Sequence, residues 1–533
     1  MPRPIGRRQF LRDTGAAIAS LVALGPAVAA CGGTTVRSAS TSTSHPGSPP
    51  AGPPPWAALA ASLSGRVVTP ADAAYVTGAQ VYNERFDSIR PAAIAYCASE
   101  GDVQRSVEFA RRFDVPLAVR SGGHSYGGYS IGDGLVLDVT LMDSVTPGVM
   151  GAAGQGVARV GAGVRLVDMY SALAGAGVTV PGGSCPTVGI AGLALGGGIG
   201  VLGRNFGLTC DNVASLRMVT ADSRVLTCGP GENEDLYWAN RGGGGGNFGV
   251  VTSFVFTTHP LPDLALFTLE WPWSAAAEAL GSWQDWIGGT PDELWSNCQL
   301  LSEGSAGAKL RVTGVFCGDV GPLAAQLQPL ERSIGTPSYR FVGPESFVAG
   351  MLIEAGCEDL SVAQCHLPTQ NPGGMLDRST FAVKSSFIDA ALPDAGITAV
   401  VDAIGGFQDH APGLGGAVVF DAFGGAVGRV APDATAFVHR RALADIEMSV
   451  TWSSAAVSPQ SDAATAWLAD TAEALEPYAS GSYQNYIDPT LEDWQTAYYG
   501  SNLERLVQVK RGVDPDGVFR FAQSIPTATS PSR

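Results

Sequence analysis

The chain has 533 residues, of which 45% are hydrophobic and 15% charged, a balance that predicts several packed domains and excludes an intrinsically disordered chain. Its net charge of −17, from 32 Lys and Arg against 49 Asp and Glu residues, repels phosphate backbones and argues against a nucleic-acid partner. The 69 glycines are clustered without a fixed period, which indicates places where the backbone approaches another group closely.

Residues 1–31 are predicted to be a targeting segment and not a domain. The twin arginine Arg7-Arg8, followed by Phe-Leu and a short apolar stretch, is typical of a twin-arginine export signal. The segment ends on Cys31 in a context that resembles a lipobox, in which the cysteine receives a lipid; ordinary cleavage just before it is the alternative. Residues 32–55 are rich in Ser, Thr and Pro and are predicted to be a linker. The sequence therefore predicts export, as a cell-surface lipoprotein or a secreted protein, with membrane contact only through that lipid.

The folded part is predicted to begin with a β-α-β unit. Residues 91–98 and 115–119 have the composition of strands, and residues 101–113 between them carry apolar side chains at helical spacing. A third strand is expected at residues 135–139. The glycine-rich segment 120–129 follows the second strand at its carboxyl end, where cofactor-binding loops are usually found.

Two denser glycine clusters follow at residues 181–200 and 241–249. Backbone N–H groups of such loops can converge on a pyrophosphate. Neither cluster ends in the Gly-Lys-Ser/Thr of a Walker A loop, and their spacing differs from the Rossmann fingerprint. The elements predicted around them are strands at 157–161, 214–220, 224–227 and 250–257 and helices at 166–174 and 234–238.

Strands and amphipathic helices alternate from residue 261 to about residue 475, which predicts a second domain. Its strand 445–452 alternates strictly, and its polar face either lines a substrate cavity or faces solvent. The residues of that face are Asp445, Glu447, Ser449 and Thr451. Trp283 and Trp286 are three residues apart, which favours a helix packed in the core over a site for sugar stacking.

Cysteines in the second half of the chain are candidates for disulfides outside the cytoplasm, with their pairing left open. They are Cys298, Cys317, Cys357 and Cys365. The chain has no Cys-x-x-Cys and its six histidines are scattered, so no metal site is predicted.

Five segments together resemble one family of flavoproteins. They are residues 120–124, 183–189, 196–200, 241–251 and 483–488. The pairing of Gly-Gly-His-Ser with Cys-Pro-Thr-Val-Gly resembles the berberine bridge enzyme-like FAD-linked oxidases, which have the FAD-binding fold of the vanillyl-alcohol oxidase and para-cresol methylhydroxylase type. The resemblance covers roughly residues 70–525, nearly the whole exported chain.

The resemblance implies an α+β fold in two parts. A two-subdomain FAD-binding domain of the para-cresol methylhydroxylase type is expected at residues 56–260, and a C-terminal segment at residues 478–533 is expected to return to it. Between them, residues 261–477 are expected to form an α/β substrate-binding domain with an antiparallel sheet.

The resemblance also implies a covalently bound FAD. In members with two tethers, the position of His124 bonds the flavin 8α-methyl group and that of Cys185 bonds C6, an arrangement associated with a raised reduction potential. Val188 resembles the valine of oxygen-using members, which favours an oxidase over a dehydrogenase. Leu193 stands where many relatives have a histidine, a departure that leaves both tethers in place. The other residues expected to bind FAD are Arg120, Ser121, Gly122, Gly123, Ser125, Gly183, Gly189, Gly192, Gly196, Gly197, Gly198, Gly200, Gly246, Asn247, Gly249, Val251 and Asn485.

Tyr486 matches the tyrosine proposed as the catalytic base in several relatives, with Tyr483 as the second choice and Glu447 as a group that supplies or assists a base. A phenol, with a pKa of about 10, must be partnered to take a proton at neutral pH. The alternative is a tyrosine that only packs between domains.

The implied reaction takes a proton from a hydroxyl of an alcohol or sugar-type substrate, transfers hydride to flavin N5, and reduces O2 to hydrogen peroxide. The expected partners are therefore a small-molecule substrate and O2. The alternatives are tailoring of a secondary metabolite by a flavin-dependent oxidoreductase and a non-catalytic surface lipoprotein that binds a ligand.

Overall fold

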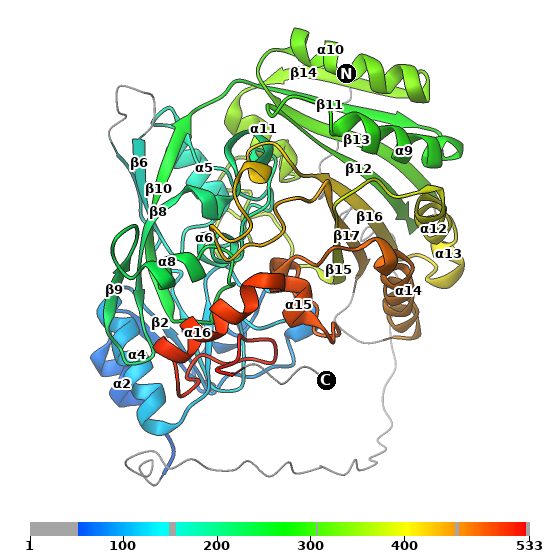
Figure 1. Ribbon diagram of the computed structural model, residues 1–533. Helices are drawn as coiled ribbons and strands as arrows, with labels where there is room; N and C mark the ends of the chain where they lie inside the picture. Colours follow the sequence, from blue (N-terminus) through cyan, green and yellow to red (C-terminus); the bar gives the residue numbers. More distant parts are fainter. Residues whose placement is uncertain (1–51, 149–155, 305–306, 454–457, 529–533) are drawn as a thin grey trace.

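The computed structural model describes residues 52–148, 156–304, 307–453 and 458–528. The described residues form three β-sheets, and Figure 1 shows the chain passing from the first two sheets to the third and then returning, in red, beside the first two. The predicted export signal, Cys31 and most of the predicted linker lie outside the described residues. In the part that the structure describes, no helix combines the length and apolarity needed to cross a membrane.

The first sheet has the strand order β1-β2-β4-β3, with β2, β4 and β3 parallel and β1 antiparallel to β2. Helix α4 crosses from β2 to β3 and begins where Ser99 Oγ accepts a hydrogen bond from the Asp102 backbone N–H at 3.2 Å. The predicted β-α-β unit is confirmed, although β3 begins two residues late, because Val115 N–H still bonds the Ala110 carbonyl at the end of α4. The elements here are α2 (Trp56–Ser62), β1 (Arg66–Val68), α3 (Tyr75–Gly78), β2 (Ala93–Tyr96), α4 (Glu100–Phe113), β3 (Leu117–Arg120) and β4 (Leu135–Asp138).

The second sheet is antiparallel, in the order β5-β6-β10-β8-β9, with β7 paired to the far end of β10. The long central strand β10 places Phe254 and Phe256 fully in the core. The predicted strands and helices around the glycine clusters are confirmed, whereas the short elements β5, β7, α6 and α7 were not predicted because two to six residues show no clear period. The elements are β5 (Val145–Pro147), β6 (Gly156–Gly161), α5 (Leu166–Ala174), β7 (Val178–Thr179), α6 (Ile190–Leu195), α7 (Gly203–Phe206), β8 (Val213–Val219), β9 (Val225–Cys228), α8 (Glu234–Ala239) and β10 (Val250–Pro260).

The third sheet has seven antiparallel strands in the order β14-β11-β13-β12-β16-β17-β15. Figure 1 shows helices α9, α10, α12 and α14 on its outer side, while its other face is turned toward the first two sheets. The change of sheet falls between β10 and β11. The elements are β11 (Leu264–Trp271), α9 (Ala276–Ile287), β12 (Leu294–Glu303), β13 (Ala308–Cys317), α10 (Val320–Ile334), β14 (Tyr339–Glu345), α11 (Phe347–Glu354), β15 (Thr380–Ile388), α12 (Asp394–Gly405), α13 (Phe407–His410), β16 (Gly415–Ala422), β17 (Ala444–Trp452) and α14 (Pro459–Leu475).

The core between this sheet and its helices explains both sequence patterns noted there. Ile446, Met448 and Val450 of β17 are fully buried on the face opposite Glu447. Trp283 of α9 is also fully buried, and its Nε1 donates a hydrogen bond to a serine hydroxyl of β12 at 3.1 Å. The predicted helix-core role of this tryptophan is confirmed.

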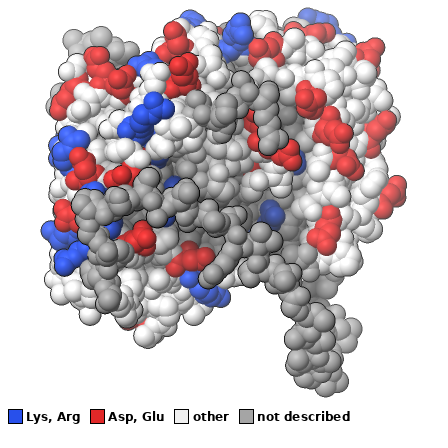
Figure 2. All heavy atoms as spheres, turned by 60° about the horizontal axis from the view of Figure 1, so that its bottom comes forward, with Lys and Arg blue, Asp and Glu red and all other residues white. Residues whose placement is uncertain are grey.

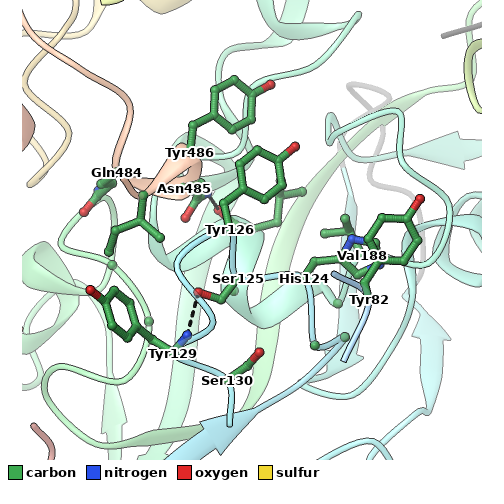
Figure 3. A pocket seen from close by; sticks show the side chains of 18 of the residues that line it. Tyr82, His124, Ser125, Tyr126, Tyr129, Ser130, Val188, Gln484, Asn485 and Tyr486 are labelled. Atoms are coloured by element: carbon green, nitrogen blue, oxygen red, sulfur yellow. Dashed lines mark hydrogen bonds between the residues drawn. The ribbon is translucent and has the colours of Figure 1, made fainter. Parts of the chain in front are cut away.

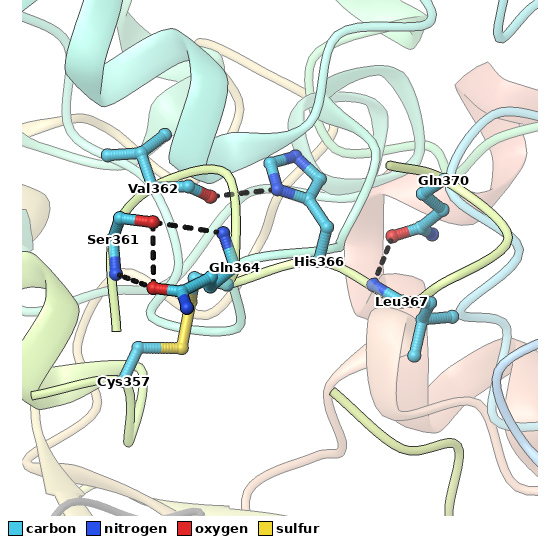
Figure 4. Close-up of a disulfide and its surroundings, with 8 residues drawn as sticks. Cys357, Ser361, Val362, Gln364, His366, Leu367 and Gln370 are labelled. Atoms are coloured by element: carbon cyan, nitrogen blue, oxygen red, sulfur yellow. Dashed lines mark hydrogen bonds between the residues drawn. A yellow bond between two sulfur atoms is a disulfide. The ribbon is translucent and has the colours of Figure 1, made fainter. Parts of the chain in front are cut away.

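A disulfide-closed loop fastens the third-sheet part of the molecule to helix α5. Cys357 and Cys365 form the disulfide, whereas the other two candidate cysteines are free thiols. Figure 4 shows His366 pointing away from the disulfide, with Nδ1 at 2.8 Å from the Val362 carbonyl. Its Nε2 lies 3.1 Å from Asp168 Oδ2 on α5. The loop thus contacts an element that packs behind one wall of the site described below.

The C-terminal tail returns to the first two sheets through α15 (Trp494–Tyr499) and α16 (Leu503–Val513). Buried Lys510 on α16 donates to the backbone carbonyl of Asn247 at 2.6 Å and to Asp514 at 2.7 Å. The tail is therefore tied to the third glycine cluster.

On the face in Figure 2, acidic and basic side chains are interspersed, and the acidic ones are spread more widely.

Candidate active site

A cavity of about 590 Å³ lies between the glycine-rich loops of the first two sheets and the open face of the third sheet. Residues of all three glycine clusters line it, together with strands β12, β15, β16 and β17 and the tail. Figure 3 shows side chains of the first glycine-rich loop and the tail converging there. Its size is that of a site for a small molecule or cofactor.

His124 lies in the first glycine-rich loop, and the side chains of Thr187 and Tyr82 contact its ring. Its Nε2 lies 2.8 Å from the Thr187 hydroxyl, and its ring stacks on Tyr82 with centroids 4.0 Å apart and 17° between the planes. Figure 3 shows the two rings face to face. The Tyr82 backbone N–H donates to the Gly123 carbonyl at 3.0 Å, beside the histidine. The imidazole therefore lines the cavity in a defined orientation.

Cys185 lies in the second glycine cluster and is the exposed thiol in the part of the chain that the structure describes. Most of the other described thiols are buried, and burial raises the pKa of Cys97, for example, to about 12. The backbone after Cys185 is held to α5 by a bond from the Leu166 N–H to the Val188 carbonyl at 3.1 Å. A thiol that faces a cavity from a fixed backbone is accessible to a ligand, unlike the buried ones.

The loops that carry these two side chains touch through a pair of glycines. A Cβ on Gly122 would lie 2.2 Å from the backbone nitrogen of Gly189, and a Cβ on Gly189 would lie 2.0 Å from Ser121 Oγ. Such distances leave no room for a side chain, so glycine at both positions permits the contact. The contact brings His124 and Cys185 to the same cavity.

Most of the residues predicted to bind FAD line this cavity. From the first cluster they are Ser121, Gly122, Gly123 and Ser125; from the second, Gly183, Val188, Gly189, Gly192 and Gly200; from the third, Gly246, Asn247, Gly249 and Val251; and from the tail, Asn485. The Asn247 side chain is engaged within the protein, because it donates to the Gly243 carbonyl at 3.0 Å and accepts from the Ile525 N–H at 2.9 Å.

Arg120 is a predicted FAD-binding residue whose side chain is engaged within the protein. It does not line the cavity; its Nε pairs with Asp138 Oδ2 at 2.5 Å, and both side chains are buried. The cause is register, because β3 and β4 pair in parallel with Arg120 opposite Asp138. The arginine therefore supports the glycine-rich loop from the sheet beneath it.

Gly196, Gly197 and Gly198, which were also predicted to bind FAD, lie outside the cavity lining. The Gly198 N–H donates to the Tyr483 hydroxyl at 2.9 Å, and a Cβ on Gly196 would lie 2.0 Å from Asn485 Oδ1. The glycine run instead makes room for the returning tail. A glycine cluster in a sequence indicates close approach but not whether the neighbour is a ligand or another segment of the chain.

Tyr483 and Tyr486 occupy different environments although they are three residues apart in the tail. The Tyr483 oxygen accepts from the Gly198 N–H at 2.9 Å, and burial raises the pKa of its phenol. Tyr486 is half-buried and stacks on Tyr126 with centroids 5.2 Å apart and 6° between the planes, as Figure 3 shows. Tyr483 is thus engaged with the backbone of the glycine run, and Tyr486 lies at the cavity with an aromatic partner.

The polar face of β17 lines the cavity and does not face solvent. Glu447, Ser449 and Thr451 belong to the lining, and the last two are buried. Asp445 is buried below them and outside the lining. Of the two interpretations of this strand, the structure supports the cavity wall.

Several lining residues were not predicted, because they come from strands whose pairing the sequence does not reveal. Cross-strand register places Arg311, Gln299 and Val419 side by side with the predicted Glu447 on four neighbouring strands. Tyr82, Trp295, Phe381 and Asp421 also line the cavity. Tyr126 follows the Gly-Gly-His-Ser motif directly, and that position was the available signal for it.

Three glycines of the cavity wall leave open space where a side chain would otherwise stand. No protein atom lies within 4 Å of a Cβ built on Gly192, and none lies closer than 3.8 Å for Gly245 or Gly246. At Gly192 and Gly245 glycine relieves no clash within the protein, so the absent side chains leave space for a bound group, whereas Gly246 also has a φ of +73° that favours glycine. The residues therefore fit FAD, while no cluster suited to a metal ion is found among the described residues.

Comparison with known families agrees with this geometry. Residues 91–229 match the model of an FAD binding domain, and residues 482–526 match the berberine and berberine-like model. The first match contains His124 and Cys185, and the second contains Tyr483 and Tyr486.

Individual relatives match over nearly their whole length. The uncharacterized FAD-linked oxidoreductase YgaK of Bacillus subtilis is 34% identical over 87% of this chain and 97% of its own. The structure of Physcomitrella patens BBE-like 1 superposes with a TM-score of 0.80, 31% identity, and coverage of 89% of this chain and 100% of that one. A glucooligosaccharide oxidase of Acremonium strictum, whose structure is described as revealing a novel flavinylation, gives a TM-score of 0.79, 27% identity, and coverage of 89% and 99%.

Proposed function

Because this chain belongs to the berberine bridge enzyme-like family of FAD-linked oxidoreductases, we propose that it oxidises sugar-type alcohols with an FAD bound covalently through His124 and Cys185. One observation carries the proposal. An imidazole and an exposed thiol stand on two touching loops and line one cavity, as attachment of one flavin at two points requires. The fold is that of an FAD-binding domain of the para-cresol methylhydroxylase type with a second, sheet-based part.

FAD, when bound, supplies an acceptor for two electrons and a hydrogen, which it can pass to O2 to give hydrogen peroxide. The two loops would hold the cofactor, and glycines such as Gly192 and Gly245 leave room for it. Val188 lies in the wall beside Cys185, and its small side chain supports an oxygen-accessible wall.

Tyr486 is the proposed base that takes up the proton of the substrate hydroxyl. It stands at the cavity on the tail, and Glu447 lies in the sheet that forms another part of the lining. Tyr483 is less suited, because burial raises its pKa and its oxygen accepts backbone hydrogen bonds. Glu447 is placed to assist by accepting a hydrogen bond from the substrate or the phenol.

The sheet wall supports a substrate rich in hydroxyl groups. Trp295 Nε1 and Thr451 Oγ1 are buried without a hydrogen-bond partner in the described part of the chain, and both residues line the cavity. Leaving such groups unpaired costs roughly 1–3 kcal/mol each, which a ligand hydroxyl can recover. A structural neighbour is a glucooligosaccharide oxidase, which supports sugars as the first class to test.

The N-terminal residues support a proposed location outside the cytoplasm. Residues 1–31 have the features of a twin-arginine signal, and that route suits a protein that folds around its cofactor before export. We propose that Cys31 then carries a lipid. Recovery of an unlipidated N-terminal peptide from the culture medium would instead indicate simple cleavage.

Acid precipitation followed by a substrate screen tests the proposed function. Yellow colour that stays with the pellet is expected, together with peroxide release on oligosaccharides. Peroxide release only on hydroxylated polyketides or alkaloids would transfer the function to secondary-metabolite tailoring. A colourless pellet and no flavin in the supernatant would favour a ligand-binding lipoprotein.

A further inference from the structure

The segment that carries Cys185 also holds the ring of His124. Thr187, two residues past the cysteine, is 1% exposed, and its hydroxyl lies 2.8 Å from His124 Nε2. That distance is typical of a hydrogen bond. A single side chain therefore links the two proposed attachment points.

The position of the Thr187 hydroxyl is set by the protein. A β-branched side chain has few rotamers, and the backbone on both sides of Thr187 is tied to helix α5. The Pro186 carbonyl accepts from Val167 at 3.1 Å. The Val188 carbonyl accepts from Leu166 at 3.1 Å. The hydroxyl is thus held in place without any contribution from a ligand.

Tyr82 supports the other side of the same ring. Its phenol ring stacks on His124, and its backbone N–H bonds the Gly123 carbonyl. Its carbonyl accepts from the Ser379 N–H at 3.2 Å, so the third-sheet part also anchors it. The Thr187 hydroxyl therefore restrains rotation of the imidazole in its plane, and the stacked Tyr82 ring restrains its tilt.

The nitrogen that attacks an electrophile must carry the lone pair, while the other nitrogen of a neutral imidazole keeps the proton. We propose that Thr187 is a positioning residue for flavin attachment. Its hydroxyl accepts the hydrogen bond of the Nε2 proton and so directs the Nδ1 lone pair toward the 8α-methyl carbon of FAD, with Tyr82 supporting the ring. This inference rests on the proposed covalent attachment.

Attachment of His124 needs only FAD and O2, which the proposed function already includes. A bond forms between Nδ1 and the 8α carbon, one methyl C–H bond breaks, and the imidazole loses its Nε2 proton. The flavin takes up the two electrons and becomes reduced. O2 then accepts these two electrons together with the two protons released from the methyl group and Nε2, and it leaves as hydrogen peroxide, which restores the oxidised flavin.

The test follows both covalent bonds in the full exported chain. Protein from riboflavin-limited cells is mixed with FAD and O2, quenched with acid at intervals, and digested, and the peptides with His124 and Cys185 are quantified by mass spectrometry. Thr187→Val keeps the shape and loses the hydroxyl, and it is expected to slow the His124 bond by about tenfold or more while the Cys185 bond still forms. Thr187→Ser is the matched control and is expected to restore the rate.

Each outcome decides between the two proposals. An unmodified His124 peptide from wild type would overturn the proposed covalent attachment itself. If the His124 peptide of wild type is modified, two results would overturn the positioning role alone. Either the His124 bond forms at the same rate in Thr187→Val as in wild type, or Thr187→Val loses the His124 and Cys185 bonds together. Should Thr187→Val fail to fold, Tyr82→Leu against Tyr82→Phe applies the same comparison. A severalfold slower His124 bond only in Tyr82→Leu supports the inference, and equal rates contradict it.

Discussion

The two walls of the cavity are built in opposite ways. The loop wall is mostly backbone: glycines set its shape, and two side chains, His124 and Cys185, supply its chemistry. The sheet wall is made of alternate side chains, such as Gln299, Arg311 and Glu447, that register brings into one row. The loop wall is suited to holding one constant group, and the sheet wall can be changed one residue at a time.

The largest expected effect is a difference between substitutions of the two tail tyrosines, Tyr486 and Tyr483. Tyr486→Phe removes the proposed base and is expected to lower kcat/KM by about a hundred- to ten-thousandfold with the covalent flavin retained. Tyr483→Phe should mainly lower the free energy of unfolding, by about 1–3 kcal/mol, because buried N–H groups lose their acceptor. Steady-state kinetics and denaturant unfolding of both variants check this. Less than a tenfold loss in Tyr486→Phe would shift the role of base to Glu447.

The second prediction concerns a buried histidine that contacts both the tail and the sheet wall. His439 stacks on Phe387 of β15 and donates to the Tyr498 carbonyl, and burial lowers its pKa to about 4. The unfolded histidine, with a pKa of about 6.5, binds more protons between these values, so stability should fall as pH drops from 6.5 to 4, by on the order of 3 kcal/mol. Between pH 6.5 and 4, the free energy of unfolding of His439→Gln should change less with pH than that of wild type. If the free energies of unfolding of wild type and His439→Gln change equally with pH, His439 is not the source of the pH dependence.

The third prediction tests the contact within the loop wall. Gly189→Ala places a Cβ 2.0 Å from Ser121 Oγ and 2.2 Å from the Gly122 nitrogen, so the two loops must separate. A cost of about 1–3 kcal/mol in unfolding is expected, with fewer chains attached at both points. Thermal unfolding and peptide mass spectrometry measure the two effects. Full attachment without a loss of stability would show that the contact is not needed.

The smallest effect comes from Gly192→Ala, the matched control on the same wall. Its Cβ meets no protein atom within 4 Å, and alanine favours the helix, so the protein without FAD should gain up to about 1 kcal/mol. FAD should nevertheless bind more weakly, because the methyl group enters the space left for the cofactor. Calorimetry without FAD and titration with FAD give the two values. Unchanged FAD affinity would place the cofactor away from this glycine.

The sequence predicted the loop wall better than the sheet wall for a physical reason. The residues around His124 and Cys185 are consecutive, so their motifs are visible in a single stretch of chain. The row that contains Gln299 and Arg311 exists only through pairing of strands far apart in the sequence. Arg120 and Gly198, which were predicted to bind the cofactor, have partners within the protein, and a sequence pattern does not tell an internal partner from a ligand.

Mass spectrometry of the exported protein tests the central claim most directly. After digestion of protein from riboflavin-replete cells, the account predicts that the peptides containing His124 and Cys185 are recovered joined through one FAD. Recovery of both peptides unmodified would contradict it.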